Sequence, residues 1–294
     1  MPSWELIGGD DPLSSYRFCR TDDIGLLVDA LNRCWAPYHP DEPFATAATF
    51  KRSIRDLQVW CSSCMVAFSG ADPIGVLIGA KRPSGTLVHR IAVHPDHRRQ
   101  GHGHHMLASL GSKLAILGPA RIVAEVPETL APARGLFSAR GFIEEAQLTD
   151  CVWDIDEHVS RGSGRADGFV IPVTVDDLAA NGLLGDCPQE CWERSVETLT
   201  ARKDEIAGLA VASEDRIEAC ILYWKDGEIA LLRSFMEDDG GRLRQLLSRV
   251  RAGGMSSLRF PKVHPAEISK DLLETLGFRP ARGHRLFAAK ARSD

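Results

Sequence analysis

The stretch from Val88 to Gly103 combines residue types that bind phosphate. An apolar run leads into a loop with two arginines and two glycines, and the loop continues into a segment with apolar residues at helical spacing. A helix N-terminus carries unpaired N–H groups and a partial positive charge, and glycine lets the backbone approach a ligand closely. The stretch therefore predicts an anion site between a strand over 86–93 and a helix over 103–117.

Two other phosphate loops and a metal site are poorer explanations of this stretch. A dinucleotide fingerprint needs GxGxxG, but Met106 stands where the third glycine would be, and no Walker A sequence is present. Five histidines lie within residues 94–105, yet none is spaced with a carboxylate as in known zinc sites. We therefore expect no metal. The histidines are His94, His97, His102, His104 and His105.

The pattern Arg98-x-x-Gly101-x-Gly103, after Ile91-Ala92-Val93, resembles motif A of the GNAT acyltransferase superfamily. The resemblance implies acetyl-CoA as co-substrate, with its pyrophosphate on the loop and its pantetheine arm on the preceding strand near a bulge. An isolated RxxGxG pattern would be weak evidence for the family. Here the expected strand before it, the expected helix after it and the Gly141-Phe142 ending strengthen the resemblance. The coenzyme-binding residues it implies are Ile91, Ala92, Val93, Arg98, Arg99, Gln100, Gly101, His102, Gly103 and His104.

Acetyl transfer to an amine requires the neutral amine, whose conjugate acid has a pKa of ~10.4, so a nearby base is useful. His89 is the first candidate, because the segment His89 to His94 resembles the arylalkylamine acetyltransferase branch, in which a histidine here is implicated as base. Glu125, on the next expected strand, is the second candidate. The alternatives are a structural histidine on a strand face and a surface carboxylate.

The general acid and one family asparagine are missing from their usual places. Phe137 occupies the position at which the family often has a catalytic tyrosine, and Leu130 stands where an asparagine is frequent. This does not exclude turnover, because a thiol with a pKa of ~8.5 leaves as thiolate at a cost of about 2 kcal/mol near pH 7, and water can protonate it.

The acceptor site is expected over the loop that follows the first helix. Trp35 and Tyr38 stand among prolines in this loop, and together they would form a stiff wall. A structural loop packed on the core is the alternative reading.

These groups require a mixed α/β fold to position them. Periodicity and turn signals predict strands over 16–19, 63–69, 73–81, 86–93, 121–126 and 142–155, and helices over 21–33, 47–57, 103–117 and 130–140. The second half predicts strands over 206–212, 216–224 and 228–235 and helices over 240–252 and 265–276.

The two halves resemble each other, which predicts a tandem repeat of one fold. Thr21-Asp22 and Thr174 each open a helical pattern after a short strand, and Gly141-Phe142 is echoed by Gly277-Phe278. We therefore expect an α/β protein with two GNAT-like domains, each a mostly antiparallel mixed sheet flanked by helices. The architecture resembles that of mycothiol-synthase-like proteins. The predicted domains are a catalytic 1–158, a linker 159–168 and a degenerate 169–294.

The second domain is not expected to bind acyl-CoA. Its loop is shorter than that of the first and carries Glu237, Asp238 and Asp239 where the pyrophosphate would lie. Asp239 is expected to cap the following helix, and the role of the domain is expected to be structural.

Composition and charge restrict the kinds of binding partner and the cellular compartment that we expect. The net charge of −5 argues against a nucleic-acid partner, and we find neither an apolar run long enough for a membrane nor an export signal. A cytoplasmic monomer or homodimer with a small-molecule amine acceptor is expected. The eight cysteines include two closely spaced pairs, Cys61/Cys64 and Cys187/Cys191. We expect buried reduced thiols and not a metal or redox site. Cys61 and Cys64 are expected to lie in a strand-like run.

The function predicted from the first domain is transfer of an acetyl group from acetyl-CoA to a primary amine of a small molecule. The alternatives are a non-catalytic acyl-CoA-binding or regulatory protein and a protein or peptide N-acetyltransferase.

Overall fold

The computed structural model describes residues 14–154, 169–185 and 191–292, and the chain forms two compact units. Unit 1 comprises Met1–Glu145 and Leu286–Asp294, and unit 2 comprises Ala146–Arg285. Both boundaries fall inside strands, β6 (Ile143–Asp154) and β12 (Arg279–Lys290). This division differs from the expected one in returning the end of the chain to unit 1. The predicted linker 159–168 lies outside the described residues.

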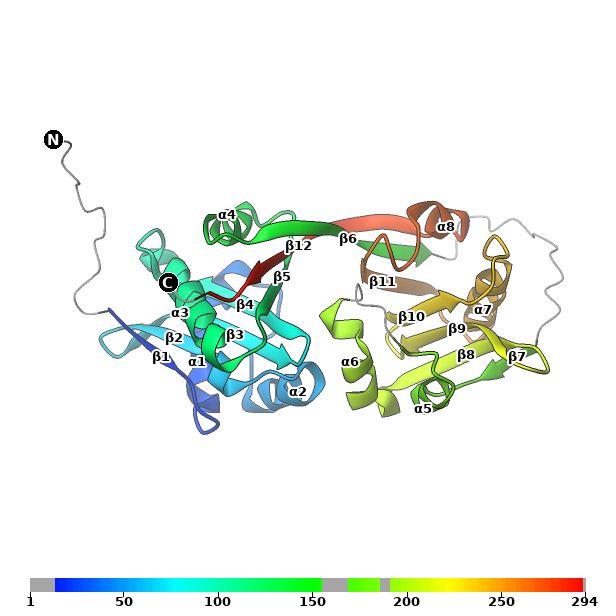
Figure 1. The fold of residues 1–294 in the computed structure, drawn as a ribbon, viewed down its shortest axis with the longest axis horizontal. Helices are drawn as coiled ribbons and strands as arrows, with labels where there is room; N and C mark the ends of the chain where they lie inside the picture. The colour runs from blue at the N-terminus through cyan, green and yellow to red at the C-terminus, as the bar shows by residue number, and fades with distance from the viewer. Residues whose placement is uncertain (1–13, 155–168, 186–190, 293–294) are drawn as a thin grey trace. The chain divides into compact units, whose positions relative to one another are not determined.

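Unit 1 is built on a mixed sheet (Figure 1). Its strands are β1 (Ser14–Phe18), β2 (Met65–Ser69), β3 (Asp72–Arg82), β4 (Gly85–Val93), β5 (Arg121–Pro127) and the end of β12. β1 to β4 pair antiparallel in chain order, and β5 joins β4 in parallel. β3 is buried along most of its length, as its apolar sequence requires in the middle of a covered sheet.

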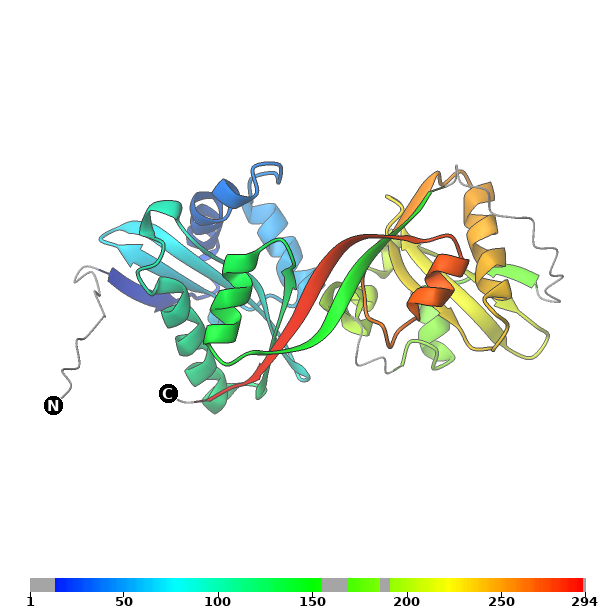
Figure 2. The same cartoon turned by 90° about the horizontal axis from the view of Figure 1, so that it is seen from above.

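Helices cover both faces of this sheet (Figure 2). α3 (His102–Leu117) and α4 (Ala131–Ala139) lie on one face, and α1 (Ile24–Cys34) and α2 (Ala47–Leu57) lie on the other. α3 turns Met106, Leu107, Leu110 and Leu114 into a core shared with β4, β5 and α4. That spacing is the apolar stripe of an amphipathic helix, so its burial fixes the rotation of α3 and aims its N-terminus at the loop after β4.

Unit 2 repeats this arrangement. Its strands are β7 (Phe169–Pro172), β8 (Ile206–Ala212), β9 (Ile217–Trp224), β10 (Ile229–Ser234) and β11 (Ser257–Val263), with most of β6 and the first part of β12. Its helices are α5 (Val175–Ala180), α6 (Val196–Ala201), α7 (Gly241–Ala252) and α8 (Lys270–Thr275). One core packs α7 and α8 and a second packs α5 and α6, so this unit also buries two helix layers.

Equivalent helix ends confirm the repeat. Gly141 and Gly277 both have left-handed φ, of 76° and 93°, and the following phenylalanine N–H bonds back to Phe137 and Leu273, respectively. This is the glycine-terminated helix end that the segments around Gly141 and Gly277 predicted. In the described residues the strands form a mixed sheet ordered β1-β2-β3-β4-β5-β12-β6-β11 and an antiparallel sheet ordered β10-β9-β8-β7. The predicted fold class, a mixed α/β fold with sheets flanked by helices, is confirmed.

Three local predictions were wrong. α1 begins at Ile24 instead of 21, because the Asp23 carboxylate accepts the Arg20 N–H and an Arg17 hydrogen bond instead of capping the helix. α8 begins at Lys270 instead of 265, where Ser269 caps it. Cys61 lies in a 3₁₀ turn and not in a strand.

No helix in the described ranges is both long and apolar enough to cross a bilayer.

Candidate functional site

The loop between β4 and α3 presents an open helix N-terminus. Gly101 is the N-cap of α3 with a left-handed φ of 88°, and Arg99 before it has a φ of 62°. A β-carbon on Gly101 would meet no atom within 4 Å, so the approach to this turn is clear. Within the described residues, the N–H groups of Gly103 and His104 have no acceptor. These are the donors that a phosphate at a helix N-terminus accepts from.

The side chains of the loop divide between solvent and protein. Arg99, Gln100 and His104 are exposed beside the open turn. His102 points inward: it is buried, and its Nδ1 lies 2.6 Å from the Tyr16 hydroxyl. His102 therefore anchors the start of α3, whereas the predicted phosphate contacts from this segment fall to the backbone and to the exposed side chains.

Gly103 lies where α3 packs closely against α4. A β-carbon here would lie 3.1 Å from a methyl carbon of Leu136 on α4. The sequence interpretation assigned this glycine to close approach of a phosphate, but the structure shows that it also lets α3 approach α4. Substitutions at Gly103 would therefore act on packing as well as on the loop.

β4 and β5 separate next to this loop. Their parallel pairing covers only Thr86 with Ile122 and Leu87 with Val123. In the pairing of β4 with β3, Val88 faces Gly79 and Arg90 faces Ile78, so His89 is the extra residue of a bulge. The predicted bulge is thus present, and it lies where the two strands part. Beyond it, Ile91, Ala92 and Val93 run along the separated edge towards the α3 turn.

The two predicted bases lie on the sheet face opposite the α3 core. Val88 and Ile91 both pack into that core, so the bulge between them directs His89 and Arg90 to the other side. On β5, Ala124 and Val126 belong to the same core, and strand alternation turns the half-buried Glu125 away from it. The structure therefore places both candidates on the face that carries α1 and the loop after it.

The predicted acceptor residues lie on this same face. Trp35 stacks on His39 with ring centroids 4.2 Å apart, and the guanidinium of Arg90 lies 4.9 Å from the Trp35 ring. Glu42 joins them, 3.1 Å from the indole Nε1 and 3.2 Å from Arg90. Arg90 and Glu42 were missed from the sequence. Arg90 follows the predicted base directly, and a bulge that sends two neighbouring side chains to one face is the signal that would have found it.

Tyr38 connects this loop to β4. Its hydroxyl donates a hydrogen bond of 2.6 Å to the carbonyl oxygen of Val93, the last residue of β4. Burial raises the pKa of Tyr38, and Arg98 opposes that shift in part. The phenol is therefore protonated at neutral pH and serves as a donor.

Phe137 is a core residue. It is 2% exposed and packs between Phe142 and Phe287, with ring centroids 5.1 and 6.1 Å away. A general acid is accordingly absent from this position, as the sequence predicted.

The described cysteines are buried thiols without disulfides, and burial raises the pKa values of Cys61 and Cys64, which keeps them protonated. Cys187 lies outside the described residues.

Comparisons with known proteins agree with this geometry. Residues 26–142 match the model of the acetyltransferase (GNAT) family. No curated protein matches the sequence at a significant level.

Solved structures share the fold over nearly the whole chain. A GCN5-related N-acetyltransferase from Sphaerobacter thermophilus has a TM-score of 0.66 at 14% identity, covering 96% of both chains. A tandem GNAT protein from the clavulanic acid biosynthesis pathway has a TM-score of 0.61 at 15% identity, covering 96% of this chain and 99% of its own. A putative acetyltransferase from Pyrococcus horikoshii has a TM-score of 0.61 at 16% identity, covering 96% and 90%.

At 14–16% identity, the similarity to these solved structures establishes the fold alone. The link to the family comes from the match of residues 26–142 to the family model. The matched segment contains β4, the open turn at Gly101 and α3, which are the elements that form the candidate site. Residues 26–142 thus match the model of the acetyltransferase (GNAT) family, and the chain has the fold of solved GNAT proteins.

Proposed function

We propose that unit 1 is an N-acetyltransferase that transfers an acetyl group from acetyl-CoA to a primary amine of a small molecule. The observation that carries the proposal is the open N-terminus of α3 beside the gap between β4 and β5. Proteins of the matched family generally use acetyl-CoA as co-substrate. The N–H groups of Gly103 and His104, with Arg98 and Arg99 nearby, suit a pyrophosphate in charge and hydrogen bonding.

The separated strands supply a second part of such a site. Because β4 and β5 pair only at Thr86 and Leu87 of β4, the later part of β4 is not covered by β5 and could bond an extended amide-containing chain, while the Val93 carbonyl already accepts the Tyr38 hydroxyl. Ile91, Ala92 and Val93 would hold the pantetheine arm in this way. Acetyl-CoA supplies the activated acetyl group when bound, and the remaining steps fall to side chains of the protein.

His89 would take the proton of the acceptor ammonium, with Glu125 as the second candidate. Both lie on the face that carries Trp35 and Tyr38, so an amine held by that loop would approach the gap from the side of the base. Taking up the proton leaves the neutral amine, which attacks the acetyl carbonyl. The nitrogen then gives its second proton to water as the amide forms and the carbon–sulfur bond breaks. Because Phe137 is buried among aromatic rings, the thiol would leave as thiolate and take its proton from water.

The coenzyme part of the proposal is tested by thermal shift and calorimetry with acetyl-CoA. We expect stabilisation of the wild type and its loss in Arg99→Asp, which places a carboxylate beside the open turn. Arg52→Asp on α2 makes the same change of charge at an exposed position elsewhere and should behave as wild type. Absence of stabilisation at millimolar acetyl-CoA would reject the proposal.

The acceptor is then sought with a panel of small amines and N-terminal peptides, followed by thiol release. Turnover of amines and not of peptides supports the small-molecule function. Turnover of peptides alone would replace it by peptide N-acetylation, and binding without turnover would identify an acyl-CoA-binding protein.

A further inference from the structure

Unit 2 retains the strand, loop and helix that form the candidate site in unit 1. β10 has a bulge at Ala230, and Glu228, the residue before β10, forms an isolated parallel bridge with Arg259 of β11. α7 begins after Gly240, an N-cap glycine with a left-handed φ of 78°, as α3 begins after Gly101. The two loops leave the sheet alike, since Phe235 N–H bonds to the Glu218 carbonyl and His94 N–H to that of Ile74.

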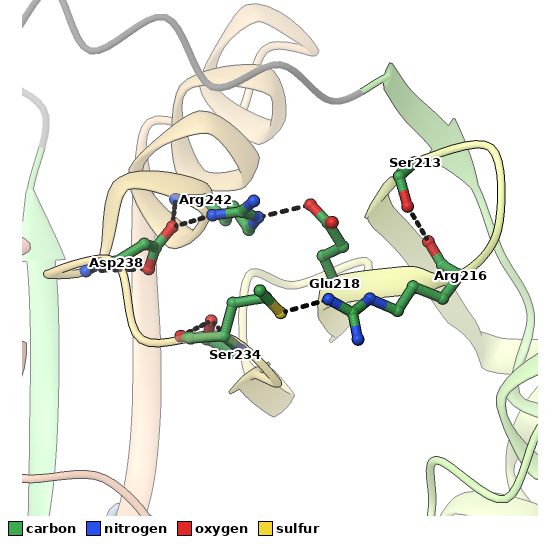
Figure 3. A network of polar contacts seen from close by, with 8 residues as sticks. Ser213, Arg216, Glu218, Ser234, Asp238 and Arg242 are labelled. Atoms are coloured by element: carbon green, nitrogen blue, oxygen red, sulfur yellow. Dashed lines mark hydrogen bonds and ion pairs between the residues drawn. The ribbon is translucent and has the colours of Figure 1, made fainter.

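The start of α7 differs from that of α3 because a carboxylate fills it (Figure 3). Asp238 accepts the N–H of Gly240 at 3.2 Å and the N–H of Arg242 at 2.8 Å. The guanidinium of Arg242 also donates to the same carboxylate, at 3.0 Å. Two backbone donors and one cation at a helix N-terminus form the set that binds a phosphate oxygen. The N-cap residue is therefore Gly240, and the carboxylate that accepts the N–H groups at the start of α7 belongs to Asp238, so the expectation that Asp239 caps the helix was wrong.

A second carboxylate holds the arginine in place. Nε of Arg242 donates to Glu218 at 2.6 Å, and Glu218 on β9 stands where unit 1 has the buried Ile74 on β3. The side chains of Asp238 and Glu218 are only 15% and 10% exposed. One guanidinium thus faces two shielded carboxylates, and the excess negative charge disfavours any incoming anion.

We infer that the carboxylate of Asp238 is a built-in substitute for a phosphate group, and that unit 2 is an acyl-CoA-type module closed by its own side chain. The loop Phe235–Gly240 is shorter than His94–Gly101, which brings Asp238 directly onto the helix start. The start of α7 accordingly binds no phosphate group in the wild type. Removing the carboxylate exposes the donors and creates a pyrophosphate site.

The test is calorimetry of the full chain with inorganic pyrophosphate. We compare wild type, Asp238→Ala and the double variant Asp238→Ala/Glu218→Gln, which leaves Arg242 without either carboxylate. Each variant should gain a site absent from the wild type and at least about tenfold tighter than any residual binding there, the effect of one hydrogen bond to a charged group. The double variant should bind more tightly than the single one.

Two controls locate the new site. Asp239→Asn removes the same charge one residue away, at a side chain that does not cap α7, and asparagine tolerates its left-handed φ of 49°. It should gain nothing. Adding Arg242→Ala to Asp238→Ala should abolish the gained binding. Asp238→Ser keeps a short capping oxygen without the charge, and it should also gain the site if the alanine variant folds poorly.

The inference is overturned if folded Asp238→Ala and Asp238→Ser bind no additional pyrophosphate, or if the wild type already has a pyrophosphate site that Arg242→Ala removes. Because the probe is pyrophosphate and the changes lie in unit 2, this outcome is independent of acetyl-CoA binding by unit 1. A chain that fails to bind acetyl-CoA would reject the proposed function and leave the closure of unit 2 to be decided by its own variants.

Discussion

Tyr38 and Arg98 contact each other twice: Nε of Arg98 donates to the phenol oxygen at 2.5 Å, and its guanidinium lies 4.2 Å from the centre of the ring. The same phenol donates to the Val93 carbonyl. A residue of the predicted acceptor loop therefore holds a residue of the predicted pyrophosphate loop against the end of β4. Arg98 is thus held by Tyr38 near the start of the α3 turn.

This contact predicts that Tyr38 contributes to coenzyme affinity through Arg98. Tyr38→Phe keeps the ring and removes both hydrogen bonds of the phenol. We expect acetyl-CoA to bind more weakly by about 1 kcal/mol, the typical value of one hydrogen bond. Arg98→Ala should weaken binding as well, and more so at low salt because charge attraction is then less screened.

A double-mutant cycle separates this coupling from two independent effects. If Tyr38 acts by positioning Arg98, the double variant should lose less affinity than the sum of the single losses. Additive losses in calorimetry would show that the tyrosine acts elsewhere. Arg52→Ala, on an exposed face of α2, provides a control for general loss of positive charge.

Packing at Gly103 leads to a prediction about stability. Gly103→Val would drive its side chain into Leu136, and overpacking of this kind costs about 1–3 kcal/mol. Chemical denaturation should therefore show a less stable unit 1. Gly101→Ala is the matched comparison, because its β-carbon meets no atom and only the left-handed φ is strained.

Shortening the partner side chain tests whether Leu136 is responsible. Combining Gly103→Val with Leu136→Ala should recover part of the lost free energy, since the valine would fill the vacated space. Equal destabilisation in both backgrounds would locate the strain elsewhere. The variant also distinguishes packing from phosphate binding, because a loss of coenzyme affinity that persists after the repair belongs to the loop.

Asp150 in unit 2 predicts a pH-dependent stability. Burial raises the pKa of Asp150, but His284 at 3.2 Å and the N–H of Lys262 together lower it by more. The pKa of Asp150 therefore lies below its ordinary value. A carboxyl with a depressed pKa contributes stability above its unfolded pKa and loses that contribution as the pH falls through its folded pKa. The contribution is therefore complete at neutral pH and disappears in the acid range below pH ~4.

Asp150→Asn removes the charge and keeps an acceptor for Lys262. We expect it to reduce the free energy of unfolding at pH 7 by about 1–3 kcal/mol, because His284 loses its charged partner. The difference from wild type should shrink as the pH is lowered towards 3. A difference that is constant across the range in urea denaturation would contradict the assignment, and Asp239→Asn serves as an exposed control.

The sequence predicted the parts of this fold that depend on local signals. Helix ends at Gly141 and Gly277, the strand before Arg98 and the helix after Gly103 all follow from glycine and from apolar periodicity. Contacts between distant segments could not be read in this way. Nothing in the sequence pairs Tyr38 with Arg98, places Leu136 against Gly103, or brings the end of β12 back to unit 1, because partners far apart in the chain leave no periodic signal.

The choice of capping residue in unit 2 also depends on a contact between distant segments. It concerns the three acidic residues Glu237, Asp238 and Asp239. Their charge alone predicted that a phosphate would be repelled, but the choice of capping residue depends on where the loop leaves β10 and on its length. The N–H of Phe235 bonds to the Glu218 carbonyl, and the few residues left before Gly240 bring the Asp238 carboxylate to the N–H of Arg242. The anchoring contact is non-local, so the sequence pointed to the wrong aspartate.

The position of His89 in the β4 bulge gives the final prediction, which concerns the pH dependence of the rate. If His89 takes the proton of the acceptor amine, His89→Ala should lower kcat/KM at neutral pH and leave the affinity for acetyl-CoA nearly unchanged. A positioned base contributes typically about 10²–10⁴-fold. The loss should shrink as the pH approaches ~10, because the amine then loses its proton without help. Glu125→Gln is the matched comparison on β5, directed to the same face. A deficit of His89→Ala that is independent of pH would show a structural role for the bulge histidine, and a pH-dependent deficit in Glu125→Gln alone would transfer the role of base to Glu125.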